Sequence, residues 1–361
     1  MGSARPTIPL TNTPRQLDSP WPHRLAVLLV CATFPLIWVG SLVTSYDAGM
    51  AVPDWPNTYG YNLFLYPIET WIFGPWDIFI EHGHRLMGAL VGLLAIAMCW
   101  AIWRLDGRSW MRVMGLVTLA AVIAQGVLGG ARVIQNEVLL AKIHGCFGPL
   151  FFGLCVALAV VTSRRWRECQ QPAVHAKAPT LHRLCVLTVL VAYIQLVLGS
   201  ELRHLVAGTT WRAFQISVVF HLLVAGFLSL QILALAVHTL LRHRDRPALW
   251  TPAMLLAAAI VLQIALGCGA WVTNYGWPAA LGDYHFAAAY VVEARGLTQA
   301  MITTAHVATG SLILGIAVML LLRAMRFLRS GSRQTGLASS RSMTKSMTGI
   351  SMTGMMMGLA G

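Results

Sequence analysis

The strongest constraint on this chain is a series of eight apolar stretches, each of which can cross the roughly 30 Å hydrocarbon core of a bilayer as one helix of about 20 residues. Such a series is typical of a polytopic membrane protein. We therefore predict an all-α fold with eight transmembrane helices. The predicted spans are 25–45, 85–103, 111–131, 142–163, 183–200, 215–240, 250–272 and 300–325.

Composition excludes the main alternatives to a membrane protein. Of the 361 residues, 57% are hydrophobic and only 11% are charged. A soluble globular domain carries about 25% charged residues, and a disordered chain combines low hydrophobicity with high charge. The seven cysteines form no C-x-x-C, C-x-x-C-H or zinc-binding spacing, and most of them lie in apolar runs. We therefore expect no disulfide framework.

The basic residues indicate how the helices are oriented. Eight spans put both termini on one side, and if that side is cytoplasmic, twenty basic residues lie inside and six outside. Cytoplasmic loops of membrane proteins carry this kind of excess of Lys and Arg. The placement accounts for most of the formal charge of +13. We therefore expect membrane lipid, and no nucleic acid, as the partner of the basic surface.

An internal repeat divides the chain into two halves. Three odd-numbered spans carry Gln-x-x-x-Gly near their outer ends, at 125–129, 195–199 and 263–267. A polar residue that recurs at one depth favours a duplicated unit, here two pseudo-symmetric four-helix bundles, although Gln and Gly are also ordinary helix-packing residues in lipid. The predicted parts are a cytoplasmic N-terminal tail (1–24), an N-terminal bundle (25–163), a cytoplasmic linker (164–182), a C-terminal bundle (183–327) and a disordered Met- and Ser-rich tail (328–361).

Each even-numbered span has a histidine near its outer end and a small residue four positions later. The pairs are His84 and Gly88, His144 and Gly148, His221 and Ala225, and His306 and Gly310. Positions i and i+4 share one helix face, so each imidazole stands above a patch without a side chain. A porphyrin fits such a patch, with histidines as axial iron ligands. Packing histidines and a zinc or copper site are the alternatives. We favour two bis-histidine haem sites, which pair His84 with His144 and His221 with His306.

Only the first half has a carboxylate beside its histidine, in the segment Glu81-His-Gly-His-Arg85. Glu81 and His84 share a helix face if the helix already begins there. Glu81 is then a candidate general base or proton acceptor for an oxidation at the haem edge. The spacing equally allows a Glu81–Arg85 ion pair, or an Arg85 contact to a haem propionate, without chemistry. The asymmetry favours a reacting site in the first half and an electron-transfer site in the second.

Taken together, these residues resemble the haem A synthases of bacterial and mitochondrial inner membranes. The resemblance rests on Glu81-x-x-His84-Arg85, on the loop Gly49-Met-Ala-Val-Pro-Asp-Trp-Pro56 and on the three other helix-start histidines. It covers residues 25–325. Some members of the family have a cysteine pair in the first outer loop; residues 46–81 contain no cysteine, so no thiol role is carried over.

The resemblance implies an oxidoreductase that converts the C8 methyl group of haem O to the formyl group of haem A, for terminal oxidases, through hydroxylated intermediates. By position, His84 and His144 would hold the substrate haem O, with Glu81 assisting the oxidation. His221 and His306 would hold a resident haem b that carries electrons. Haem O synthase and terminal oxidase subunits are further candidate partners.

Two other function classes stay open on spacing alone. One is a bis-histidine dihaem membrane cytochrome for quinol-linked electron transfer, and the other is a haem carrier or assembly factor. The cytochrome would have no use for a carboxylate confined to one half, and the carrier would bind haem reversibly and leave its methyl group untouched. The asymmetry and the first-loop motif favour the enzyme. The absence of an Arg- and Ser-rich presequence favours the bacterial cytoplasmic (inner) membrane over the mitochondrial inner membrane.

Overall fold

The computed structural model describes residues 19–277 and 296–330. In these ranges, eight helices are long and apolar enough to cross a membrane, which confirms the predicted number of spans. They are α1 (Trp21–Ser45), α3 (Trp76–Leu105), α4 (Ser109–Gln135), α5 (Val138–Thr162), α7 (Ala178–Arg203), α8 (Trp211–Arg242), α9 (Pro247–Tyr275) and α11 (Leu297–Phe327). The predicted tail at 331–361 and most of the predicted N-terminal tail lie outside the described residues.

The largest difference from the predicted spans is at the start of α3, which begins at Trp76 and not at residue 85. Pro75 precedes the helix in an extended conformation, and Asp77 lies in the first turn, where a negative charge is favourable. The predicted span began at Arg85, so the polar segment from Glu81 to His84 preceded it, and whether the helix already included this segment was left open. The structure places it inside the helix, so Glu81 and His84 do lie on one helix face.

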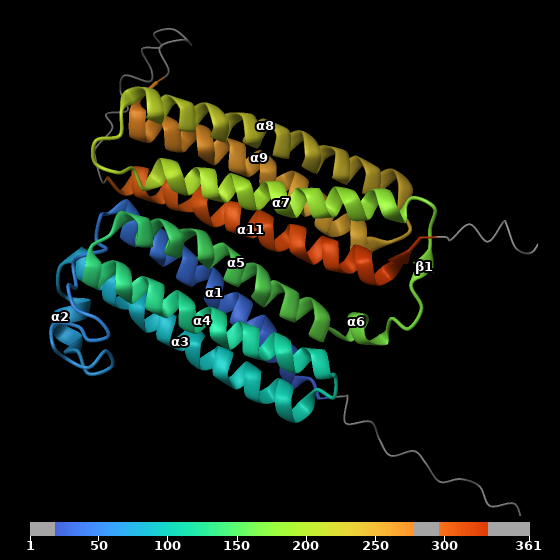
Figure 1. The fold of residues 1–361 in the computed structure, drawn as a ribbon, viewed down its shortest axis with the longest axis horizontal. Coiled ribbons are helices and arrows are strands. Elements are labelled where there is room, and N and C mark those ends of the chain that lie inside the picture. The colour runs from blue at the N-terminus through green and yellow to red at the C-terminus, as the bar shows by residue number, and fades with distance from the viewer. Residues whose placement is uncertain (1–18, 278–295, 331–361) are drawn as a thin grey trace, which may run out of the picture.

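The long helices form two groups that lie side by side (Figure 1). Helices α1, α3, α4 and α5 pack against one another, as do α7, α8, α9 and α11. The groups meet where α11 contacts α1 and α5, and where α5 contacts α7. About half of the apolar windows of α5 and α11 is buried, 56% and 50%, against 17% for α4. Helices α5 and α11 are therefore the central ones.

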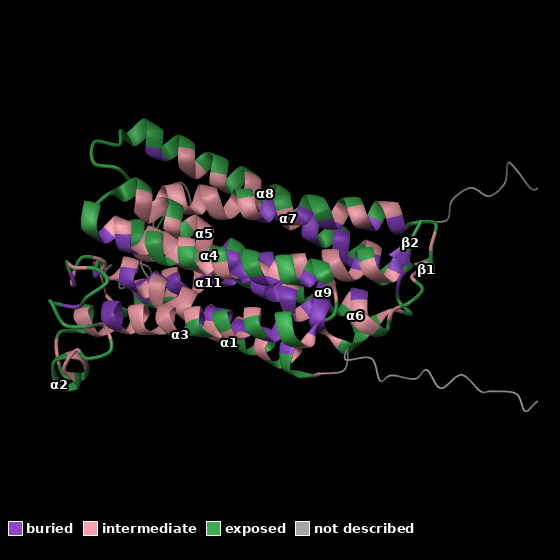
Figure 2. Ribbon diagram, turned by 60° about the horizontal axis from the view of Figure 1, so that its bottom comes forward, coloured by how far each residue is buried: buried purple, intermediate pink, exposed green. Residues whose placement is uncertain are grey.

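Exposed residues lie along the outward-facing sides of the helices (Figure 2), and many of them are large and apolar. Leu93 of α3, Val113 of α4 and Leu230 of α8 are each about 60% exposed or more. An extended apolar surface of this kind marks a membrane-facing region. Buried residues lie between the helices, in one cluster centred on α1, α3 and α5 and another centred on α7, α9 and α11.

Short elements connect the helices. Helix α2 (Ile68–Ile72) lies in the first long loop, and α6 (Arg164–Glu168) follows α5. Strands β1 (Ala173–Val174) and β2 (Leu328–Arg329) form a two-stranded parallel sheet that joins the segment before α7 to the end of α11. The described residues are helical in all their long elements, as predicted, and this pair of two-residue strands is too short to leave a periodic signal in the sequence. Helix α2 and the sheet lie at opposite ends of the helices (Figure 1).

Candidate functional site

The four helix-start histidines form the two pairs that the sequence predicted. His84 of α3 faces His144 of α5, and His221 of α8 faces His306 of α11. The ring centroids are 6.4 Å apart in both pairs. Nitrogen–metal bonds of about 2 Å on opposite sides of one metal ion put two imidazole centroids about 6 Å apart. Both pairs therefore have the separation of two axial ligands.

Backbone carbonyls orient the rings in α5 and α11. Nδ1 of His144 lies 3.2 Å from the carbonyl oxygen of Gln125, and Nδ1 of His306 lies 3.2 Å from that of Gln263. A carbonyl oxygen only accepts, so each Nδ1 is the protonated nitrogen. The unprotonated Nε2 is the nitrogen that could bind a metal, as in metal-ligating histidines whose other ring nitrogen donates to the protein. In His306 this Nε2 lies 3.4 Å from the amide nitrogen of Gln263, whose N–H it accepts.

A glycine of a neighbouring helix lies under each of the four rings. A Cβ atom at Gly40, Gly129, Gly199 or Gly267 would lie only 2.7, 3.0, 3.4 or 3.0 Å from Cε1 of the facing histidine. Three of these glycines end the Gln-x-x-x-Gly repeats. The fourth, Gly40 of α1, was missed because Leu36 takes the place of the glutamine. The repeat therefore sets the position of the imidazoles as well as helix packing.

The patch expected four residues after each histidine is not bare at every site. A Cβ atom at Gly88 would meet nothing within 4 Å, as expected. At Gly148 it would lie 3.5 Å from Nε2 of Gln125, and at Gly310 3.4 Å from Nε2 of Gln263. The repeat glutamines turn their amides toward the histidines and so lie over these two glycines. Spacing along one helix carries no information about a side chain from its neighbour.

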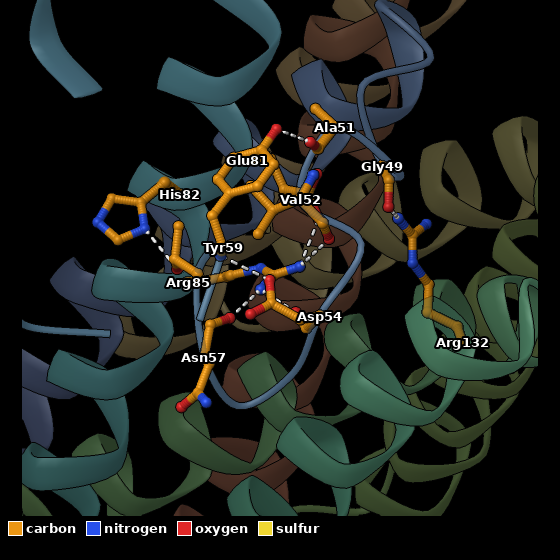
Figure 3. Close-up of polar contacts among 11 residues, drawn as sticks. Gly49, Ala51, Val52, Asp54, Asn57, Tyr59, Glu81, His82, Arg85 and Arg132 are labelled. Atoms are coloured by element: carbon orange, nitrogen blue, oxygen red, sulfur yellow. Dashed lines mark hydrogen bonds and ion pairs between the residues drawn. The ribbon is translucent and has the colours of Figure 1, made fainter. Parts of the chain in front are cut away.

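The carboxylate of Glu81 is buried and has two partners (Figure 3). Oε2 accepts the N–H of Val52 at 2.7 Å, and Oε1 accepts Nη2–H of Arg85 at 2.8 Å. The i,i+4 ion pair that the spacing allowed is therefore present. It does not decide whether Glu81 also takes part in chemistry, and that role stays a prediction.

Arg85 holds the first outer loop against α3. Its Nη1 donates to the carbonyl oxygens of Asp54 and Asn57, at 2.6 and 2.9 Å, and its Nη2 donates to that of Val52, at 2.7 Å. Glu81 and Arg85 together hold both polar groups of the Val52 backbone (Figure 3). The contacts of Arg85 are with the loop and Glu81, and its predicted contact to a haem propionate stays a prediction.

Asp54 shapes the turn that Arg85 holds. Its carboxylate accepts the backbone N–H groups of Tyr59 and Gly60, each at 2.8 Å. Burial raises the pKa of Asp54, but these N–H donors and the nearby guanidinium of Arg85 outweigh it, so the pKa lies below its ordinary value. Asp54 is therefore ionised at neutral pH and stabilises the turn. The Asp-Trp-Pro motif of the sequence has this structural use.

His82 lies away from the histidine pairs. Its Nδ1 is 3.0 Å from Oγ1 of Thr58, and its ring packs against Tyr66 and Trp71 at centroid distances of 5.1 and 5.2 Å. It is 2% exposed. His82 therefore anchors the first outer loop.

Two arginines near the histidine pairs were counted only as outer charges in the sequence. Arg132 of α4 donates to the carbonyl oxygen of Gly49 (Figure 3). Arg203 of α7 donates to the carbonyl oxygen of Ser41, at 2.6 Å, and to Oγ of Ser45, at 2.8 Å, so it joins the second half to α1. A cavity of about 170 Å³ lies between Arg132 and His204 at the same end. An arginine at the end of an apolar run is the only sequence signal for these contacts.

Comparison with known proteins gives one family. The model of the COX15-CtaA family, described as cytochrome oxidase assembly protein, matches residues 74–294. This range is more than half of the chain and includes Glu81, His84, Arg85, His144 and His221. His306 and the loop around Asp54 lie outside it.

Several curated relatives are similar to the chain over most of its length. A protein named Heme A synthase from Shouchella clausii is 26% identical over 73% of this chain and 90% of its own length. One of the same name from Exiguobacterium sibiricum is 24% identical over 70% of this chain and 86% of its own length. A third, from Symbiobacterium thermophilum, is 32% identical over 49% of this chain and 58% of its own.

Proposed function

The chain belongs to the COX15-CtaA family of cytochrome oxidase assembly proteins, and from this we propose that it is a membrane oxidoreductase that makes haem A by oxidising the C8 methyl group of haem O to a formyl group. The name shared by its relatives supports the product. The observation that carries the proposal is that the two histidine pairs have the same ring separation, but only the first has a carboxylate within one helical turn.

In this proposal, His84 and His144 hold the substrate haem O, and His221 and His306 hold a resident haem b. The separation of the rings and the Nδ1 contacts of His144 and His306 support this assignment, because they leave Nε2 of each of these rings as the nitrogen that would bind iron. Haem b, when bound, accepts and passes on electrons. The chain itself fixes the imidazoles with Gly40, Gly129, Gly199 and Gly267 and with the carbonyl oxygens of the repeat.

The two helix groups are, in this proposal, duplicated and pseudo-symmetric, with 25–163 as the haem O bundle and 183–327 as the haem b bundle. The four contacts between a glycine and a histidine support the duplication. In each half, the first and third long helices supply the glycines, and the second and fourth supply the histidines. Both termini lie in the cytoplasm, as the basic residues indicate. The histidine pairs then lie near the outer face of the bacterial cytoplasmic membrane.

Glu81 is the proposed proton acceptor in the oxidation of haem O. Its carboxylate is buried next to the turn of α3 that carries His84, and the ion pair with Arg85 keeps it in place. Removal of hydrogen from a methyl group releases protons, and a fixed carboxylate can take them up. The loop held by Arg85 covers this carboxylate from the outside and limits the access of water.

A dihaem electron-transfer cytochrome is the second candidate. The specific observation in its favour is that both oxygens of Glu81 are already engaged by Val52 and Arg85, as in a purely structural ion pair. Such a protein would hold haem in both pairs without changing it. The difference between the two functions is therefore the chemistry of haem O.

The test is expression of the chain in bacterial cells that make haem O but no haem A. Haems extracted from the membranes are separated by chromatography and identified by mass. The proposal expects haem A, or a hydroxylated form of haem O, together with haem b. Unmodified haem O in membranes that contain the folded, haem b-bearing protein would contradict it and favour the cytochrome.

The glycine contacts give a second expected result. Gly267→Ala places a methyl group 3.0 Å from Cε1 of His306, and this overpacking should cost about 1–3 kcal/mol. Because the ring must shift, the low-spin haem absorbance of the purified protein should weaken. Gly226→Ala on α8 is the matched control, because its Cβ atom would meet nothing within 4 Å. Equal haem absorbance in both variants would contradict the role of Gly267.

A further inference from the structure

A second group of histidines lies at the opposite end of the second half, by the two-stranded sheet. His243 follows the last residue of α8, His238 lies one turn earlier, and His175 follows β1. The ring of His243 is 4.4 Å from that of His175 and 5.9 Å from that of His238, measured between centroids. Neither haem pair nor the first outer loop uses these residues.

Three ring nitrogens of this group are buried without a hydrogen-bond partner among the described residues. His243 has no exposed surface, and among the described residues neither its Nδ1 nor its Nε2 has a hydrogen-bond partner. Nε2 of His238 is also buried without a partner there. Nδ1 of His175 accepts the N–H of Lys177 at 3.1 Å, which leaves its Nε2 for another contact. A buried polar atom without a partner is costly, so a group that engages these nitrogens is expected.

We propose that His175, His238 and His243 form a binding site for one divalent transition-metal ion of the kind that prefers imidazole ligands, such as Zn²⁺. Nitrogen–metal bonds of about 2 Å place the centroids of two imidazoles on one tetrahedral ion about 5 Å apart. The two measured separations lie on either side of this value.

The site is completed by rotation of the rings. In the described part of the chain, no group of three or more histidine, cysteine, aspartate or glutamate side chains is already arranged to hold a metal ion. Rotation about the terminal torsion of histidine is soft and turns the ring nitrogens, whereas a change of the first side-chain torsion moves the ring itself. The two measured separations differ from the tetrahedral value by about 1 Å or less. The backbone is already held, because the N–H of His175 donates to Arg329 and that of His243 donates to Thr239.

The charges around the cluster set the expected affinity. The histidines lie in the field of three positively charged side chains, those of Lys177, Arg242 and Arg246. One negatively charged side chain, that of Asp245, is also close and is paired with Arg246 at 3.4 Å. Positive neighbours weaken the binding of a cation, so coordination by three neutral nitrogens must supply the affinity. A bound ion would join the segment before α7, which carries β1, to the connection between α8 and α9.

The test uses the full chain, purified in detergent with a histidine-free tag and treated with a chelator. Zn²⁺ is titrated in competition with a chromophoric indicator. His243→Ala should weaken the tightest Zn²⁺ binding by at least about tenfold. Loss of a residue that merely hydrogen-bonds to a metal ligand already lowers metal affinity by about 10- to 100-fold, and loss of a ligand should cost no less. His182→Ala is the matched control, because its Nε2 already pairs with the carbonyl oxygen of Ala324, and it should bind like the original chain.

Zn²⁺ binding at the outer histidine pairs is the same in all variants and cancels in this comparison. If His243→Ala fails to fold, His175→Ala, at a half-buried position, replaces it with the same expected loss. Zn²⁺ should also raise the unfolding temperature of the original chain and not that of the variant. Superimposable titrations of the original chain and the variants would overturn the site.

Discussion

Replacing Glu81 with glutamine is expected to lower the rate of haem A formation by about 10²- to 10⁴-fold, the range for loss of a general acid or base. Glutamine keeps an oxygen that accepts the N–H of Val52 but loses the charge and the proton affinity of the carboxylate. The haem b absorbance should be unchanged, because Glu81 lies in the other half from His221 and His306. Haem A is measured by extraction and mass detection at equal protein content.

Asp54→Asn is the control for an indirect effect through the loop. The carboxylate of Asp54 also holds loop N–H groups, those of Tyr59 and Gly60. Arg85 of α3 contacts the backbone carbonyl of Asp54, which asparagine retains. This variant should retain most of the haem A formation. If Glu81→Gln forms haem A at the original rate, Glu81 has only the structural role of an ion-pair partner.

Arg85→Ala is expected to have the largest effect on the outer loop. The change removes the donors to the carbonyl oxygens of Val52, Asp54 and Asn57 and leaves the buried carboxylate of Glu81 without its ion pair. Breaking one side of a buried pair costs about 3–5 kcal/mol. The first outer loop should therefore become sensitive to limited proteolysis.

Arg164→Ala is the matched control, because Arg164 and Glu168 form the same i,i+4 pair on an exposed surface. The side chain of Arg164 is 85% exposed, against 10% for Arg85. An exposed pair contributes about 0–1 kcal/mol, so this variant should be cut at the original rate. Equal protease sensitivity of the two variants would show that Arg85 does not hold the loop.

The helices were predictable because the signal for a membrane span is contained in one continuous segment. Burial of α5 and α11 at the centre was not, since all eight spans are similarly apolar and only packing distinguishes them. The start of α3 was missed for a related reason. Hydropathy reads Glu81 and Arg85 as solvent-exposed, whereas the loop supplies their partners from more than 25 residues away.

The candidate ligands were also predictable, because each histidine repeats at one depth with a fixed local spacing. Their supporting contacts were only partly visible. The Gln-x-x-x-Gly repeat indicated a duplication, but that its glycine lies under an imidazole depends on which helices are neighbours. The copy on α1 was hidden by Leu36. The group of His175, His238 and His243 was not predicted, because His175 and His243 are distant in sequence and neither is part of a repeat.

The central claim is that each histidine pair holds a different haem. Its most direct test is the haem content of purified His84→Ala and His221→Ala proteins from cells that make haem O. The account predicts that His84→Ala retains haem b but contains neither haem O nor haem A, and that His221→Ala loses haem b. Loss of haem b from His84→Ala with retention in His221→Ala, or equal haem content in both variants, would contradict it.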